Sequence, residues 1–213
     1  MKIIVNILKN TLVGIIFLIN NYSSFGQLNC SSDTIAMINE IRASYQEINK
    51  QSNNYKVVNE GTIDFSLSGE ELQNFATGDN SWNAKEIIKY FDKDSLTIYK
   101  ENNRYGAFQV GETRIFKEFY IKNGKLFFYY EREFFYSFVP SAFQSFVKEY
   151  RIYFCNENPI RLLKKELIWE SHPKEMDYDN FFDYATNHIN IEKNQSVDFN
   201  SYKNLNEIKT QWK

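Results

Sequence analysis

Three short segments with the same residue pattern place the strongest limit on how this chain can fold. Each runs from an aromatic residue through an apolar residue and a polar turn to an aliphatic residue, and they begin about 30 residues apart. In the second segment, Asn123 and Gly124 are the strongest local signal for a two-residue type I′ turn, because both central residues must adopt positive φ. The repeat therefore predicts three hairpins of an antiparallel meander, at Tyr90–Leu96, Tyr120–Leu126 and Tyr153–Ile160.

The hairpins extend into longer strands on both sides of each turn. We expect one more strand or two between Gly61 and Thr77, where apolar and polar residues alternate. The repeat itself predicts strands near residues 85 to 92, 95 to 101, 112 to 122, 125 to 136, 148 to 155 and 159 to 168.

The central turn also predicts a register. A two-residue loop pairs Ile121 with Leu126 and Phe119 with Phe128 on one face of the sheet. The pairs predicted for the other face are Tyr120 with Phe127 and Glu118 with Tyr129.

Two connections depart from the repeat. Residues 102 to 111 (NNRYGAFQVG) are predicted to be a loop from their Asn and Gly content. Residues 134 to 147 (FFYSFVPSAFQSFV) form an aromatic segment around Pro140, which we interpret as a short helix that covers the core. The alternative is a lid over a ligand, since long irregular connections often carry function.

Amphipathic patterns at both ends supply helices for this sheet. From Asp33 to about Asn53 the apolar residues recur at helical spacing, and Asp33 offers an N-cap. Residues 177 to 187 and 199 to 212 show the same spacing, with a break at 194 to 196. We therefore expect a single α+β domain, in which an antiparallel β-meander sheet of about six to eight strands is packed by an N-terminal helix and C-terminal helical segments.

Residues 1 to 26 have the pattern of a Sec-type signal peptide. Two lysines accompany an apolar run over residues 11 to 19, which is shorter than the ~20 residues that span a bilayer. Ser24 and Gly26 are small residues suited to a cleavage site. Cleavage would leave residues 27 to 213 as one periplasmic or secreted domain with no integral membrane segment.

Two other interpretations of this segment fit less well. An uncleaved membrane anchor is disfavoured because Asn20 and Asn21 end the apolar run early. A lipoprotein modified at Cys30 would need apolar and small residues just upstream, where Gln27, Leu28 and Asn29 stand.

In an oxidising compartment the two cysteines, Cys30 and Cys155, are natural disulfide partners. The alternative is a buried Cys155 that packs as a small hydrophobic residue beside a free Cys30. A catalytic cysteine fits less well, because neither residue lies in a recognisable nucleophile motif.

Charge and motif content weigh against nucleic acid and against the common catalytic classes. The chain has 25 Lys and Arg against 27 Asp and Glu, so it offers no positive surplus for phosphate contacts. Motifs of serine hydrolases, zinc proteases, P-loops, dinucleotide folds and dithiol redox centres are not in the sequence. The best hydrolytic or metal candidate would join His172 or His188 to a carboxylate such as Asp177. The simpler interpretation places His172 on a turn, Asp177 at a helix N-terminus and His188 near its end. We expect no metal and no cofactor.

Aromatic residues make up 17% of the chain and suggest binding. Those that would stack on a sugar ring or line an apolar cavity are Tyr120, Phe127, Tyr129, Phe138 and Phe143. The alternative is a second hydrophobic layer under a helix. We therefore expect an exported, non-enzymatic binding or interaction protein whose partner is a protein or a small ligand. A periplasmic carrier or sensor of an apolar or carbohydrate ligand held between sheet and helix is the second hypothesis, and a hydrolase is the third.

The segments FYIKNGKLFFYY and RIYFCNENPIRLL, preceded by IIKYFDKDSLTIY, also carry a resemblance. Over roughly Lys85 to Leu163 the chain resembles a group of secreted proteins of Gram-negative bacteria with repeated aromatic hairpins of the form Y-Y-F-x-N-G-K-L. More distantly the hairpins are similar to variants of MORN repeats. The resemblance implies an exported protein built from β-hairpins and carries over no functional residue.

Overall fold

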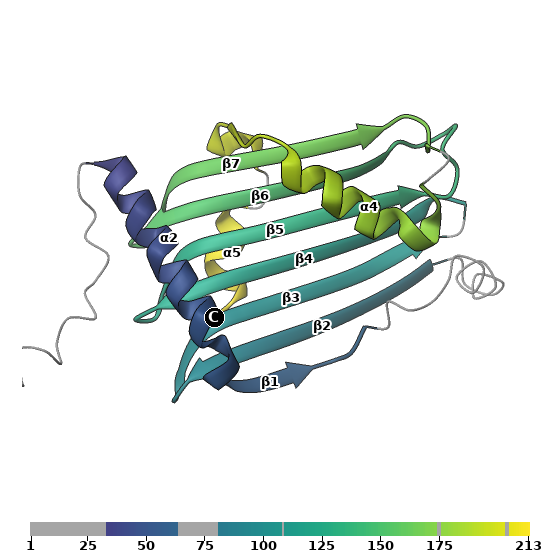
Figure 1. Cartoon of the computed structure of the whole chain (residues 1–213). Helices are drawn as coiled ribbons and strands as arrows, with labels where there is room; N and C mark the ends of the chain where they lie inside the picture. Colours follow the sequence, from purple (N-terminus) through teal and green to yellow (C-terminus); the bar gives the residue numbers. More distant parts are fainter. Residues whose placement is uncertain (1–32, 64–80, 108, 174–175, 203–204) are drawn as a thin grey trace, which may run out of the picture.

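A single antiparallel sheet of eight strands organises the molecule (Figure 1). The computed structural model describes residues 33–63, 81–107, 109–173, 176–202 and 205–213. The strands lie side by side in chain order, which confirms the expected meander. They are β1 (Lys56–Glu60), β2 (Ser81–Asp92), β3 (Ser95–Ala107), β4 (Gly111–Lys122), β5 (Lys125–Ser137), β6 (Ser145–Cys155), β7 (Asn158–Trp169) and β8 (Gln195–Ser196).

Three two-residue turns close the predicted hairpins β2–β3, β4–β5 and β6–β7. Asn123 and Gly124 have φ of 53° and 69°, as a type I′ turn requires. Asn156 and Glu157 repeat this geometry with φ of 48° and 62°, although Glu157 is not a glycine. The repeated sequence pattern therefore produces repeated hairpins.

The predicted register is correct only next to the turn. Ile121 pairs with Leu126 as expected, but Tyr120 pairs with Phe128, because a bulge shifts the register between Tyr120 and Ile121. Phe127 is the extra residue of that bulge. The remaining predicted pairs are wrong by one residue, since Phe119 pairs with Tyr129 and Glu118 with Tyr130. Equivalent shifts occur in the other two hairpins, between Tyr90 and Phe91 and between Tyr153 and Phe154.

The strands are longer than predicted, so two of the expected connections are wrong. Residues 102 to 107 belong to β3, because their backbone pairs with β4. The segment from 134 to 147 contains no helix: its two ends belong to β5 and β6, where Phe135 pairs with Phe146. Between them is a turn in which Phe143 N and Ala142 N both donate to Val139 O. Strand β1 is a short polar edge strand without a clear sequence signal. Of the segment from Gly61 to Thr77, where one more strand or two were expected, residues 64 to 77 lie outside the described residues.

The expected helices form at both ends of the chain. Helix α2 (Thr34–Gln51) begins after Asp33, which accepts hydrogen bonds from the Ile35 and Ala36 amides. Asp177 and Asn180 form a capping box at the start of α4 (Tyr178–Ile191). The remaining helical segments are η1 (Ser52–Asn54), η2 (Phe199–Ser201) and α5 (Leu205–Gln211).

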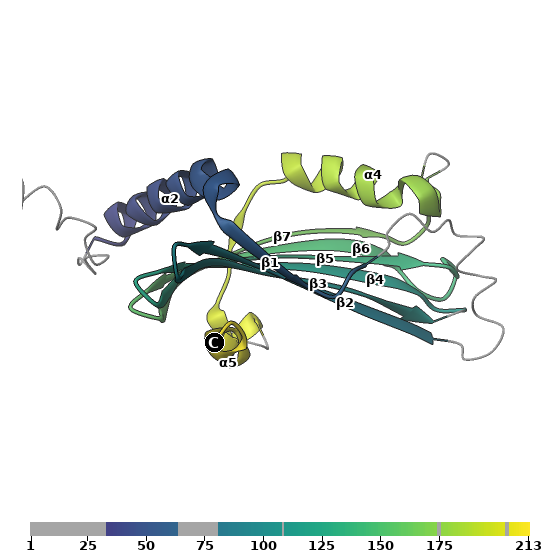
Figure 2. The same ribbon diagram turned by 90° about the horizontal axis from the view of Figure 1, so that it is seen from below.

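Different helices cover the two faces of the sheet. Figure 2 shows α2 and α4 on one face, near opposite ends of the strands, and α5 on the other face. We call the first the two-helix face; Tyr120 and Tyr153 lie there under α2, and Phe134 under α4. We call the second the α5 face, where Phe119 and Tyr129 pack in the same core cluster as α5. The sheet is thus the middle of three layers.

Several predictions about export fall on undescribed residues. Cys155 is buried at the end of β6, but Cys30 and the expected signal peptide, residues 1 to 26, lie outside the described residues. The disulfide and the cleavage site stay predictions. Within the part of the chain that the structure describes, no helix has the length and apolar character needed to cross a bilayer.

Candidate functional site

On the two-helix face, α2 and α4 lie near opposite ends of the strands (Figure 1). Between α2 and the sheet lies a pocket of about 260 Å³. Helix α2 and strands β5 and β6 supply its lining, which comprises Ile41, Arg42, Tyr45, Gln46, Phe128, Tyr130, Arg151 and Tyr153.

Local geometry explains why these residues meet. Helical spacing places residues 41, 42, 45 and 46 on one side of α2, and the buried Ile41 anchors that side on the sheet. Tyr130 lies directly opposite Arg151 in the β5–β6 ladder, and Phe128 lies opposite Tyr153. Alternation along each strand directs all four side chains to the two-helix face.

Aromatic rings build the floor of the pocket. The Tyr45 ring meets Phe128 in an edge-to-face contact with centroids 5.1 Å apart. Phe128 in turn contacts Tyr153 at 5.2 Å. Such edge contacts between aromatic rings hold the rings in place.

Two arginines give the pocket a positive charge. The guanidinium of Arg42 lies 6.0 Å from the centroid of the Tyr153 ring and forms no salt bridge with any described residue. Arg151 Nη2 lies 2.7 Å from Glu149 Oε1, and Arg132 Nη2 lies 2.6 Å from Glu149 Oε2. One carboxylate therefore serves two guanidiniums, and none of the residues that line the pocket is acidic. This arrangement favours an anionic ligand.

Glu149 is held ionised beneath the pocket, where its side chain is only 1% exposed. Burial alone would raise its pKa, but the hydrogen bond from Arg132 and the charges of Arg151 and Arg132 lower it. Burial and the charge of Glu149 raise the pKa of Tyr130 well above its ordinary value. Tyr130 is therefore protonated and donates to Glu149 Oε2 at 3.0 Å.

The same network reaches α4. Arg132 also donates to the side-chain oxygen of Asn190 at the end of α4. Lys165 Nζ donates to the Ile189 and Asn190 carbonyls at 3.1 and 3.3 Å, where a cation suits the helix C-terminus. Arg132 and Lys165 thus bond the sheet to the C-terminal end of α4.

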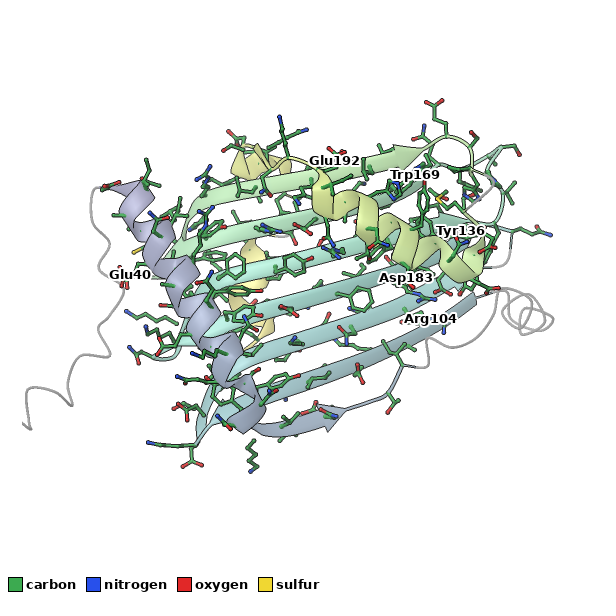
Figure 3. All side chains as sticks on the ribbon, viewed as in Figure 1. Glu40, Arg104, Tyr136, Trp169, Asp183 and Glu192 are labelled. Atoms are coloured by element: carbon green, nitrogen blue, oxygen red, sulfur yellow. The ribbon has the colours of Figure 1, made fainter. Side chains whose placement is uncertain are left out.

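A second buried ionic cluster lies at the other end of α4 (Figure 3). Glu112 accepts from Arg104 at 2.9 Å, from Arg114 at 2.6 Å and from the Tyr178 hydroxyl at 2.7 Å. The Arg114 guanidinium also lies 3.4 Å from the centroid of the Phe182 ring. The cluster is fully enclosed, so we assign it to the attachment of α4 rather than to a ligand.

The predicted histidine site is not assembled among the described residues. His172 Nε2 lies 2.6 Å from Ser145 Oγ and its ring stacks near Tyr136, with no described carboxylate in hydrogen-bond reach. Ser145 is fully buried and accepts from the Ser137 amide, so a substrate has no access to its hydroxyl. Burial lowers the pKa of His172 and keeps the ring neutral. Asp177 caps α4 and His188 lies in its last turn, as the simpler interpretation expected.

The five aromatic residues proposed from the sequence lie in several places. Tyr120 and Phe127 are buried together under α2, next to the pocket but outside its lining. Tyr129 is buried on the α5 face. Phe138 packs against the α4 cluster, and Phe143 is exposed on the turn before β6. The structure does not bring them into one site, and ligand binding by them remains a prediction.

The pocket residues that sequence reasoning missed are Arg42, Tyr45, Tyr130 and Arg151. Tyr45 belongs to the apolar residues at helical spacing in α2, a pattern that indicates packing on a core rather than a binding site. Arg42 lies beside that stripe, and Arg151 alternates with Tyr153 along β6. Their meeting depends on where α2 crosses the sheet, which no local pattern reports.

Comparison with models of known protein families, with curated proteins and with solved structures finds no match for this chain. The function must therefore be argued from the pocket itself.

Proposed function

We propose that the protein is an exported binding protein that holds a small organic anion with an apolar or sugar ring in the pocket between α2 and the sheet. The observation that carries this proposal is the combination of an aromatic floor with Arg42 and Arg151 at its edge. A guanidinium forms two parallel hydrogen bonds with a carboxylate, and a tyrosine ring stacks on a sugar or aryl ring.

The size of the pocket limits the ligand. A volume of about 260 Å³ lies near the lower end of the range for small-molecule sites. It suits a monosaccharide acid or a short aryl acid, rather than a long acyl chain or an oligosaccharide.

The chemistry of the lining supports binding rather than turnover. The described groups that line the pocket are cationic, amide, phenolic or apolar, and none is a carboxylate or imidazole that would transfer a proton. The proposal that the chain is exported rests on the pattern of residues 1 to 26.

Calorimetric titration with matched acids and neutral analogues tests the proposal. We expect glucuronate or phenylacetate to bind, and glucose or benzyl alcohol to bind at least tenfold more weakly, because the neutral analogues leave the guanidiniums unpaired. Arg42→Gln and Arg151→Gln should each weaken binding of the acid about tenfold or more, as expected for loss of a charged hydrogen bond.

Arg161→Gln is the matched control. Arg161 lies opposite Tyr153 in the β6–β7 ladder but does not line the pocket. Equal binding of acids and neutral analogues, or an equal loss in all three arginine variants, would contradict an anion site at this position.

A further inference from the structure

A second pocket lies on the other flank of α2, beside the turns of the hairpins β2–β3 and β4–β5; we call it the turn pocket. Its volume is about 350 Å³, larger than that of the first pocket. Residues 44, 47, 48 and 51 of α2 line it, whereas residues 41, 42, 45 and 46 line the first pocket. Helical spacing places these two sets on different sides of the helix, so one helix separates two pockets.

Unlike the first pocket, the turn pocket is lined by charges of both signs. Glu47 and Asp92 are acidic, and Lys93 and Lys122 are basic. None of the four forms a salt bridge with a described residue. Equal numbers of the two signs give no net attraction for a simple anion or a simple cation. The charges therefore match a ligand that carries both signs itself.

The positive end of the turn pocket is at Lys122, beside the middle of α2. Lys122 Nζ donates to Ser44 Oγ at 3.2 Å, which holds the ammonium against the helix. Ser44 is buried and Lys122 is half-buried. An ammonium has three donors, and among the described residues only Ser44 accepts from this one. The remaining donors can bind a carboxylate of a ligand.

The negative end is at Tyr55, just beyond the C-terminal end of α2. Burial and the charges of Asp92 and Glu47 raise the pKa of Tyr55, so the charges of both carboxylates act at its hydroxyl. The last carbonyls of α2 add partial negative charge at the same end. This end of the pocket therefore suits an ammonium group.

The distance between the two ends limits the length of the ligand. Ser44 and Gln51, which line opposite ends, are seven positions apart in α2, or about 10 Å at the helical rise. An extended chain of three amino acids spans at most about 10 Å, whereas a single amino acid is too short. Ile48, Leu96 and Ile121 supply the apolar part of the lining, which suits small apolar side chains.

We propose that the turn pocket binds a short peptide of about three residues with both termini free. Its carboxylate lies at Lys122, and its ammonium lies by Asp92 and Glu47. The terminus of a folded protein brings only one of these two charges, so the fit is to a free peptide. The turn pocket shares no residue with the first pocket, so this proposal does not depend on the proposed function.

Calorimetric titration with trialanine and two blocked analogues tests the proposal. N-acetyl-trialanine lacks the ammonium, and trialanine amide lacks the carboxylate. We expect trialanine to bind and each analogue to bind at least tenfold more weakly, because each leaves one charged end of the pocket unpaired.

Variants assign each terminus of the peptide to one end of the pocket. Lys122→Gln should weaken binding of trialanine about tenfold, without weakening binding of the amide any further. Asp92→Asn should do the same for trialanine, without further effect on the N-acetyl peptide.

The same two turns offer matched controls. Lys125 pairs with Lys122 across one turn, and Asp94 lies in the turn that follows Asp92, but neither lines the pocket. Lys125→Gln and Asp94→Asn should leave binding of trialanine unchanged, as should Arg42→Gln in the first pocket. Thermal unfolding of each variant shows that it is folded. No binding of trialanine by the wild type overturns the proposal, as do blocked analogues that bind equally well or controls that lose binding as the pocket variants do.

Discussion

At the scale of single residues, buried carboxylates with several donors organise this sheet. Glu112, Glu149 and Glu101 are each almost fully buried, and each receives hydrogen bonds or ion pairs from two or more side chains. A carboxylate in this position is stable only while its donors remain, because burial penalises the charge. These residues connect strands and helices that are far apart in the chain.

Glu112→Ala should destabilise the fold by about 3 to 5 kcal/mol, since two buried guanidiniums lose the carboxylate between them. Urea unfolding at neutral pH measures the loss. Glu60→Ala is the matched control, because the Glu60 side chain is 51% exposed where it pairs with Lys89, and surface pairs contribute about 1 kcal/mol or less. Similar losses for both variants would show that the Glu112 cluster is not essential.

Glu101 should make stability depend on pH in the acid range. Burial alone would raise its pKa, but hydrogen bonds from Lys85, Asn103 and Gln211 and the charge of Lys117 lower it from 4.5 to about 2. A pKa lowered by folding stabilises the protein above the unfolded value, and the contribution is lost as the pH falls from about 4.5 toward about 2.

The measurement is the unfolding free energy of wild type and Glu101→Gln between neutral pH and about pH 2. We expect the wild type to be more stable by about 3 kcal/mol at neutral pH, with the difference shrinking below about pH 4.5. Glu60→Gln is the control, and it should change the stability by about 1 kcal/mol or less at neutral pH, because its pair with Lys89 is exposed. A constant difference for Glu101→Gln at every pH would rule out this linkage.

At the scale of elements, two of the three hairpins use one turn geometry with different residues. Gly124 occupies the second turn position of β4–β5 with φ of 69°, and Glu157 occupies the same position of β6–β7 with φ of 62°. A left-handed conformation costs an L-residue with a side chain about 1 kcal/mol or more, whereas glycine adopts it freely.

Glu157→Gly should therefore stabilise the protein by about 1 kcal/mol, and Gly124→Ala should destabilise it by a similar amount. A Cβ at Gly124 meets no atom within 4 Å, so the second effect would come from backbone conformation alone. Loss of the exposed Glu157–Lys213 pair at 3.4 Å should matter little. Chemical denaturation of both variants gives the two signs, and a destabilised Glu157→Gly would contradict the turn argument.

At the scale of the whole molecule, helices pack on both faces of the sheet, α2 and α4 on one and α5 on the other. The proposed ligand pocket lies between α2 and the sheet on the two-helix face, whereas α5 packs on the other face. The expected disulfide would add a link between the start of the mature chain and the end of β6.

Protein exported by its own host should have the mass of residues 27 to 213 less two hydrogens, if the signal peptide is removed and Cys30 pairs with Cys155. Intact-mass spectrometry with and without reductant measures both features. Cys30→Ser should lower stability by about 4 kcal/mol in the chain-entropy model, and by as much as reduction of the wild type. A reduced mass in the exported protein would contradict the disulfide.

Local patterns predicted most of the elements but not the contacts between them. The turn at Asn123 and Gly124 and the caps at Asp33 and Asp177 were visible because each depends on a few consecutive residues. The register beyond the turn was wrong, because the bulge at Phe127 leaves no mark in a pattern of alternating apolar residues.

The sequence by itself determined the repeated hairpins, the helices with their N-cap residues and the α+β class. The spacing of apolar residues and the chemistry of turns act over short distances along the chain. Only the tertiary structure decided which helix covers which face, and so brought Arg42 of α2 to Arg151 of β6. It also left Tyr105 and Ile168 exposed on the α5 face. The physical reason is that a sheet offers two faces of similar apolar character, and the choice between them depends on packing over the whole surface.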